Sequence, residues 1–357
     1  MTHAPPPLPA QIEKLATATP GHDVHQPFID WAVPRIADER TRALFSRMAG
    51  RSGIEHRWSV LSPTPDGGSP VDAGGFYDHD PLPATSTRMA AYAQAAPELA
   101  LAAIAKLGCE PSRITHLVVA SCTGFVAPGI DQIIAQKMGL SPHVERTLIG
   151  FMGCYAGVTA LRTARHIVRS QPDAVVLLVS VELSTLHLDD QSDIEPLLAM
   201  LQFSDGAAAA IISTAPGGVS IGPGLSLAMP DSDALIRWDI GDHGFVMHLS
   251  GAVPGRIEKA LSQPDVQAAL FPDSVPTHLA IHAGGRSILD AVERSLNLSA
   301  DALSHSRNTL RDFGNMSSAT IFFAIEGLMK AGVHGPGLAL AFGPGLAAEA
   351  VALDFHP

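Results

Sequence analysis

Short apolar segments of strand length alternate with helical segments along most of the chain, and this alternation limits the folds available to it. Residues 115–121 form a β-branched run, and helical spacing follows at 130–140. Two further apolar runs, 174–181 and 206–213, come after a helical stretch at 155–170. Strands that alternate with helices predict parallel pairing and an α/β fold class.

The C-terminal part of the sequence repeats this pattern. Residues 115–120 and 277–281 both read Thr-His-Leu followed by apolar residues, as expected of an internally duplicated chain. Other segments are predicted from their spacing and composition: helices at 28–51, 86–107, 287–296 and 317–330, strands at 277–282 and 338–342, and a Gly- and Pro-rich loop at 62–78.

The composition argues against several classes of function. Hydrophobic residues make up 46% of the 357 residues and charged residues only 16%, which favours a buried sheet covered by helices. A net charge of −12 argues against non-specific binding of nucleic acid. No apolar run reaches the roughly 20 residues that a stable membrane span needs. Three scattered cysteines indicate neither a disulfide framework nor a zinc site, so we expect a reducing, cytoplasmic location.

Cys154 is the first candidate for chemistry. It lies in GFMGCYAG, between Gly153 and Gly157 and directly before a helical run. The positive end of a helix dipole stabilises a thiolate, and small neighbours let a substrate approach the backbone. A free cysteine is nevertheless often a buried structural residue, so the local sequence supports both interpretations.

His282 and Asn315 are the partners that such a thiol would need. His282 ends a predicted strand, and strand ends open onto the functional face of α/β sheets. Asn315 lies in GNMSSAT, just before a predicted helix. Taken singly, His282 could be one of 16 structural histidines and Asn315 a helix N-cap. As a set, the histidine would activate the thiol, and both side chains would stabilise an enolate or oxyanion.

These motifs resemble those of the type III polyketide synthases, the chalcone synthase-like enzymes. Within that family, the sequence resembles a bacterial-type member. The resemblance rests on GFMGCYAG, AIHAGGRSILD, GNMSSAT and AFGPGL, and it extends from about residue 12 to residue 355. It implies a thiolase-like fold of two duplicated α/β halves in five αβαβα layers, working as a homodimer. Residues 1–215 would carry the nucleophilic cysteine, and residues 216–357 the catalytic histidine and asparagine.

The same resemblance implies a reaction. Cys154 would take the acyl group of a starter acyl-CoA as a thioester. His282 and Asn315 would hold malonyl-CoA while it loses CO₂ and becomes an enolate nucleophile. Repeated condensation would lengthen the chain before cyclisation to a pyrone, resorcinol or phloroglucinol. The substrates are CoA thioesters, and the resemblance implies no metal or other cofactor, in agreement with the lack of nicotinamide- or flavin-binding motifs.

Further residues match substrate-binding positions of the family. Phe203 corresponds to the gatekeeper phenylalanine between the CoA tunnel and the cavity, although it could equally be a core aromatic. Arg47 and Arg51 match basic positions that bind the CoA phosphates, and their i,i+4 spacing would place them on one helix face. A solvated helix face is the alternative. Ser184 and His187 fall at two further cavity positions.

The chain also departs from the plant enzymes of this family. Met247 replaces the second gatekeeper phenylalanine, Leu44 replaces a basic residue, and Ala127 replaces a methionine that reaches the partner's cavity. Cys122 stands in place of a threonine, and it could line the cavity as a second thiol or fill space beside a strand. His187 also differs from the plant residue. A flexible methionine in place of phenylalanine suggests a differently shaped cavity.

Three other functions share parts of this pattern. The alternative within the same reaction type is a ketoacyl synthase III-like enzyme, which performs one condensation with an acyl-carrier protein, but its histidine usually precedes Gln-Ala-Asn. A cysteine protease has the order Cys, His, Asn but a different motif around the cysteine. A non-catalytic acyl-binding subunit would not need all three residues.

Overall fold

The computed structural model describes residues 8–356 of the chain. Its centre is a mixed sheet of nine strands in the order β11-β12-β13-β8-β1-β7-β6-β4-β5. Its strands are β1 (Ala10–Ala18), β4 (His116–Ser121), β5 (Glu145–Gly150), β6 (Val176–Leu183), β7 (Asp205–Ser213), β8 (Val219–Ala228), β11 (His278–Ile281), β12 (Gly335–Gly343) and β13 (Ala347–Phe355). Two small antiparallel sheets pair β2 (His22–Asp23) with β3 (Trp58–Ser59), and β9 (Ile236–Gly241) with β10 (Gly244–Leu249).

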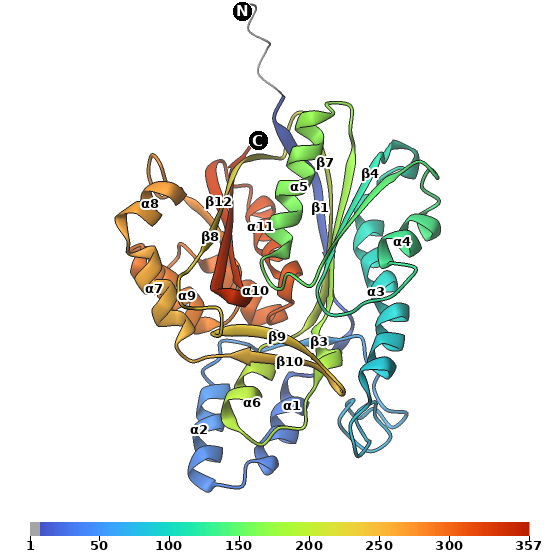
Figure 1. Cartoon of the computed structure of the whole chain (residues 1–357), viewed down its shortest axis with the longest axis vertical. Coiled ribbons are helices and arrows are strands. Elements are labelled where there is room, and N and C mark those ends of the chain that lie inside the picture. Colours follow the sequence, from blue (N-terminus) through green and yellow to red (C-terminus); the bar gives the residue numbers. More distant parts are fainter. Residues whose placement is uncertain (1–7, 357) are drawn as a thin grey trace, which may run out of the picture.

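Helices cover the sheet on several sides (Figure 1). They are α1 (His25–Ala32), α2 (Glu39–Ala49), α3 (Thr85–Leu107), α4 (Ile130–Met138), α5 (Ala156–Ser170), α6 (Ile194–Met200), α7 (Val253–Leu261), α8 (Pro264–Leu270), α9 (Arg286–Ser295), α10 (Ser304–Phe313) and α11 (Thr320–Lys330). Helices α5 and α11 contact strands from both ends of the chain, whereas α3 packs on β1, β6 and β7.

The strand order is similar on the two sides of the sheet's centre. From β1 outward, β7 and β6 pair antiparallel and β4 follows β6 in parallel. From β8 outward, β13 and β12 pair antiparallel and β11 follows β12 in parallel. The expectation of parallel pairing therefore holds only for the outer strands. The turn Pro344–Leu346 between β12 and β13 is too short for a crossover, so these strands must be antiparallel.

Most predicted elements agree with the structure to within a few residues, but the first predicted helix does not. The helical spacing at 28–51 belongs to two helices, α1 and α2, separated by a short 3-10 turn at Val33–Arg35. Pro34 lies in this turn, where it has no backbone N–H to continue α1. The loop predicted at 62–78 contains no helix or strand. Within residues 8–356, no helix is both long and apolar enough to cross a membrane.

The first turn of α5 packs tightly against the segment that precedes α11. A Cβ atom on Gly157 would lie 2.3 Å from the carbonyl oxygen of Ser318, so only glycine permits this approach. The start of α5 and the turn before α11 are thereby brought together from positions distant in the sequence.

Candidate active site

Cys154 lies in a tight turn between β5 and α5. Phe151 and Gly153 in this turn have φ values of 53° and 79°, and the carbonyl oxygen of Gly153 accepts the N–H of Ala156 at 2.9 Å. A Cβ atom on Gly153 would lie 2.3 Å from Cδ of Pro344. The left-handed backbone and this close approach both require glycine, which explains the Gly-Cys sequence.

The thiol of Cys154 is buried against the side chains of Ser317 and Asn315. Burial raises the pKa of Cys154 to about 12, and the hydrogen bonds from Ser317 and Asn315 offset only part of this effect. The sequence-based expectation of a stabilised thiolate therefore does not hold for the free chain. Desolvation of a buried sulfur outweighs the field at the start of α5, so the thiol is neutral until a base takes its proton.

His282 is a buried imidazole placed directly after β11. Its backbone N–H donates to the carbonyl oxygen of Leu340 at 2.8 Å. Neither ring nitrogen has a hydrogen-bond partner within residues 8–356, and burial lowers the pKa of His282 to about 3. A neutral imidazole with two uncommitted nitrogens is able to accept a proton at one atom and donate one at the other. Buried polar atoms without partners are rare in structural roles and are typical of sites that bind a ligand.

Asn315 connects the thiol, the loop after His282 and the turn that carries Phe203. Its backbone N–H donates to the carbonyl oxygen of Gln202 at 2.8 Å, and its carbonyl oxygen accepts the N–H of Ser204 at 2.9 Å. Its side-chain Oδ1 accepts the N–H of Ser317 at 2.9 Å. This bond fixes the amide so that Nδ2 faces the carbonyl oxygen of Gly284 at 3.4 Å.

A cavity of about 180 Å³ lies beside this group and is lined mainly by apolar side chains. Four predicted residues line it, namely Phe203, Met247, Ser184 and His187. Within the described residues, Cys154, His282, Asn315 and Cys122 are outside the lining. The remaining lining residues come mostly from α1, the segments 57–61 and 69–77, the region from Leu188 to Met200, and the β9–β10 hairpin.

His187 forms part of the cavity wall with both ring nitrogens bonded. Nδ1 accepts the N–H of Phe245 at 3.0 Å, so Nε2 carries the hydrogen that is donated to the carbonyl oxygen of Thr123 at 2.7 Å. Burial lowers the pKa of His187 to about 3. This histidine is therefore neutral and has no free nitrogen to offer a substrate.

Ser184 differs from the other buried polar groups around the cavity. Its Oγ atom is buried and has no partner in the part of the chain that the structure describes. By contrast, the hydroxyl of Tyr77 donates to the carbonyl oxygen of Thr185 at 2.6 Å, and Nε1 of Trp238 donates to the carbonyl oxygen of Cys122 at 3.0 Å. Ser184 therefore offers the cavity an uncommitted hydroxyl group.

Cys122 is tied to the backbone beside the nucleophile candidate. Its Sγ accepts the N–H of Gly153 at 3.0 Å and donates to the carbonyl oxygen of Gly153 at 3.4 Å. Burial raises the pKa of Cys122 well above its usual range. Of the two interpretations left open by the sequence, this geometry favours a small buried residue that supports the turn around Cys154.

Glu182 is a buried carboxyl group that the sequence analysis missed. It accepts the N–H of Cys122 at 2.9 Å and the hydroxyl of Thr123 at 2.8 Å, and it also accepts the hydroxyl of Ser318. Burial raises the pKa of Glu182 to about 7, although these bonds act in the opposite direction. The signal was available, because a carboxylate in an otherwise apolar strand is unusual.

Arg47 and Arg51 are both exposed, and neither is among the residues that line the cavity. Arg47 lies in the last turn of α2, but Arg51 lies beyond Ala49, where the helix ends. The predicted helix therefore stops short of Arg51, whose backbone N–H donates to the carbonyl oxygen of Met48 at 3.1 Å in the turn after the helix. The match of both arginines to CoA-binding positions stays a prediction. Leu44 and Met48 are also exposed on α2, so this surface combines basic and apolar side chains.

Comparisons with known proteins cover nearly the whole chain. The sequence profile of the N-terminal domain of chalcone and stilbene synthases matches residues 9–216, and the profile of the C-terminal domain matches residues 224–356. The alpha-pyrone synthesis polyketide synthase-like protein Pks18 of Mycobacterium tuberculosis is 31% identical, over 98% of this chain and 92% of the relative.

Two solved structures are similar along their full length. PKS-I from the brown alga Ectocarpus siliculosus has a TM-score of 0.87 and 26% identity, over 98% of this chain and 99% of that protein. The C-terminal type III polyketide synthase domain of Steely1 from Dictyostelium has a TM-score of 0.86 and 24% identity, over 97% of this chain and 99% of that domain.

Proposed function

We propose a specific reaction for this chain, which belongs to the chalcone and stilbene synthases, a family of type III polyketide synthases. The chain is accordingly an acyltransferase with a thiolase-like α/β fold, and its family implies CoA thioesters as substrates. We propose that it loads the acyl group of a starter acyl-CoA onto Cys154 and extends it repeatedly with malonyl-CoA. The observation that carries this proposal is the buried imidazole of His282, whose ring nitrogens have no partner within residues 8–356 and whose following loop is bonded to Asn315 through Gly284.

In the loading step, His282 is the base. The neutral thiol of Cys154 gives its proton to a free nitrogen of His282 as Sγ attacks the starter carbonyl carbon. The C–S bond to CoA then breaks, and the departing CoA sulfur takes the proton from the imidazolium. The high pKa of the buried thiol and the low pKa of the buried imidazole both favour neutral groups between turnovers.

In the extension step, His282 and Asn315 stabilise an enolate. Loss of CO₂ from malonyl-CoA leaves negative charge on the thioester oxygen, where the N–H groups of His282 and Asn315 Nδ2 would donate. The enolate carbon then attacks the acyl carbonyl carbon on Cys154, the C–S bond to the cysteine breaks, and the sulfur takes a proton from water. The extended chain is now a CoA thioester and returns to Cys154 by the loading step before the next extension. Because Ser317 fixes Oδ1 of Asn315, the amide plane is held in place, and the N–H of Nδ2 that is not directed at Gly284 would be the donor.

The cavity supports an apolar starter chain. Its lining is mainly apolar, and the hydroxyl of Ser184 is the buried polar group available to a carbonyl oxygen of the growing chain. The related protein Pks18 is named as an alpha-pyrone synthesis polyketide synthase-like protein. We propose an α-pyrone as the product of this chain, with resorcinols and phloroglucinols as the other cyclisation outcomes.

We also propose a homodimer, with the thiolase-like halves 1–215 and 216–357 in five αβαβα layers in each subunit. Support for a dimer comes from β5, an edge strand that is mostly exposed. Leu148 on β5 and the nearby Phe125 are 46% and 45% exposed, and apolar side chains on a free strand edge favour pairing with another chain. Ala127 follows Phe125 in the same segment. A reducing compartment such as the cytoplasm is part of this proposal, because the nucleophile must remain a free thiol.

Mass-spectrometric product profiling tests the reaction. Purified protein is given malonyl-CoA with acyl-CoA starters from acetyl to long-chain and aromatic, beside a Cys154→Ala variant. Extended and cyclised products that disappear in the variant are expected. If the Cys154→Ala protein still makes extended product, Cys154 is not the nucleophile. A single condensation that requires an acyl-carrier protein would replace the proposal by a ketoacyl synthase III-like reaction.

A further inference from the structure

Arg57 is a buried cation next to the cavity that the sequence analysis did not single out. It directly precedes β3, is 3% exposed and contributes to the cavity lining. Burial lowers the pKa of Arg57 to about 10, against the opposing effect of Asp23 and Asp205, so the guanidinium stays charged at neutral pH. A buried charge is stable only where hydrogen bonds replace its hydration.

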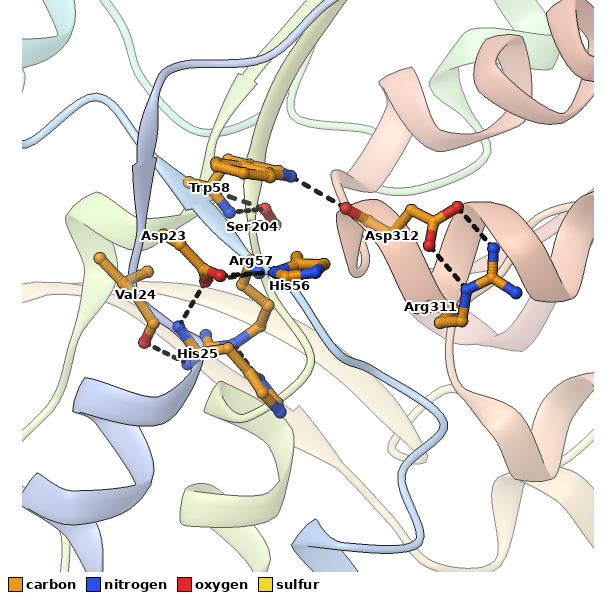
Figure 2. Close-up of polar contacts among 9 residues, drawn as sticks. All are labelled: Asp23, Val24, His25, His56, Arg57, Trp58, Ser204, Arg311 and Asp312. Carbon is orange, nitrogen blue, oxygen red and sulfur yellow. Dashed lines mark hydrogen bonds and ion pairs between the residues drawn. The ribbon is translucent and has the colours of Figure 1, made fainter.

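The guanidinium of Arg57 bonds to two separate segments. Nη1 donates to the carbonyl oxygens of Phe203 at 2.8 Å and Met200 at 3.1 Å. Nε donates to Nδ1 of His25 at 3.1 Å, and Nη2 donates to the carbonyl oxygen of Val24 at 3.3 Å. Figure 2 shows Arg57 beside Val24 and His25. One side chain therefore connects the start of α1 to the end of α6.

The segment at the start of α1 is itself held in place by Asp23. Oδ1 of Asp23 accepts the backbone N–H groups of His25 at 3.0 Å and Arg57 at 3.2 Å, while Oδ2 accepts Nδ1 of His56 at 2.7 Å (Figure 2). Burial, with the Arg57 charge adding to it, lowers the pKa of His25 to about 4. His25 is therefore neutral near pH 7, and its Nδ1 remains an acceptor for Arg57.

The segment at the end of α6 carries the cavity residue Phe203 and is bridged to Asn315. Met200 is the last residue of α6, where a cation interacts favourably with the helix carbonyls. Phe203 follows and forms an isolated parallel bridge with Asn315. The stem of Arg57 also packs on the residue before Asn315, since a Cβ atom on Gly314 would lie 3.0 Å from Arg57 Cγ.

We infer that Arg57 is a positioning residue that holds Phe203 in the cavity wall and, through the bridge to Phe203, Asn315 behind it, and thereby sets which starter chain is extended. The role of Arg57 in starter choice rests on the proposed function. The role of Arg57 in holding the Phe203 turn does not. A lysine at this position has one nitrogen in place of three, so it cannot bond both segments with the same geometry.

The experiment compares Arg57→Lys and Arg57→Met with the wild-type protein and with Arg165→Met as a control. Arg165 also donates to a carbonyl oxygen, that of Ile221 at 3.0 Å, but it lies away from the cavity lining. Hydrogen exchange is followed at the backbone amides of Ser204 and Asn315. We expect exchange roughly tenfold faster in both Arg57 variants, equivalent to losing about one charge-assisted bond, and unchanged in the control.

The same proteins are then given an equimolar mixture of short and long acyl-CoA starters. We expect the ratio of products to change in the Arg57 variants, with KM for the starter rising more than kcat falls and Arg57→Lys closer to wild type. Unchanged exchange at Ser204 and Asn315 would overturn the inference whatever the activity. Faster exchange with an unchanged product ratio would overturn the role in starter choice. Absence of product from the wild-type protein would instead reject the proposed function, while exchange still decides the role of Arg57.

Discussion

The imidazole of His187 is stacked on the ring of Phe245, with the ring centroids 4.2 Å apart and the planes 11° from parallel. Trp238 meets both rings edge-on, at centroid distances of 5.4 Å and 5.7 Å. Since both nitrogens of His187 are bonded, the stack is a fixed wall of the cavity. The bulk of His187, and not its acid–base chemistry, is therefore the property that a substrate meets.

Replacing His187 by alanine is expected to enlarge the cavity and destabilise the fold. The loss of a buried ring and of two hydrogen bonds should lower the free energy of unfolding by about 3 kcal/mol. Longer or bulkier starters should be accepted better than by the wild type, as measured by product profiling. The pH dependence of kcat between pH 5 and 8 should keep its shape. A loss of the pH dependence in this variant would show that His187 titrates during the reaction.

Replacing Ser184 by alanine is expected to separate stability from activity. The Oγ atom has no partner in the described structure, so its removal should leave the free energy of unfolding unchanged or raise it by up to about 1 kcal/mol. Product formation should fall, because the growing chain loses a hydrogen-bond donor. Chemical denaturation and product profiling on the same preparation measure both quantities. A clear loss of stability would indicate an internal role for this hydroxyl.

Replacing Asn315 by alanine is expected to block extension while loading continues. Removal of one preorganised donor to the enolate should lower the rate of malonyl-CoA decarboxylation by roughly 100-fold or more. Acylation of Cys154, followed by intact-protein mass spectrometry, should persist. Asn308→Ala, at an exposed position of α10, is the matched control. Equal losses of loading and decarboxylation would mean that Asn315 acts by holding the local structure.

Replacing Met247 by phenylalanine is expected to change the length of the acyl starter that the enzyme prefers. Met247 lines the cavity on β10, and an aromatic ring would take space that a flexible thioether can vacate. Shorter starters should therefore gain relative to longer ones in a competition assay, so that each reaction contains its own control. An unchanged ratio across the starter range would remove Met247 from the determinants of specificity.

Cys154, His282 and Asn315 could be singled out from the sequence because each lies within two residues of a glycine at the end of a predicted element. The strand β1 could not be predicted, because its sequence AQIEKLATA contains mostly good helix formers. Its strand conformation depends on pairing with β7, some 195 residues away. Arg57 could not be found either. Its role depends on the end of α6 and on Val24, and no local pattern distinguishes a buried arginine from a solvated one.

The pKa of the Cys154 thiol could not be predicted for a related reason. Its place before α5 is visible in the sequence, and it suggests a stabilised thiolate. The depth of burial is a property of the packed fold, and here it reverses the expected direction. The same applies to Glu182, which directly follows the strand predicted at 174–181 and whose three hydrogen-bond donors come from Cys122, Thr123 and Ser318.

Glu182 is expected to make the stability of the protein depend on pH in a way that Glu182→Gln removes. The folded-state pKa of Glu182 is raised from 4.5 to about 7, so between these values the folded chain keeps a proton that the unfolded chain has lost. Its contribution to stability is therefore present below pH 4.5 and is lost as the pH rises through 7, with a slope of about 1.4 kcal/mol per pH unit. Other titrating groups are common to both proteins and cancel in the difference.

Urea denaturation of wild type and Glu182→Gln at several values from pH 5 to 8 measures this effect. The variant should gain stability relative to the wild type as the pH rises to 7 and should gain none beyond it. A difference that stays constant over this range would mean that Glu182 is ionised throughout.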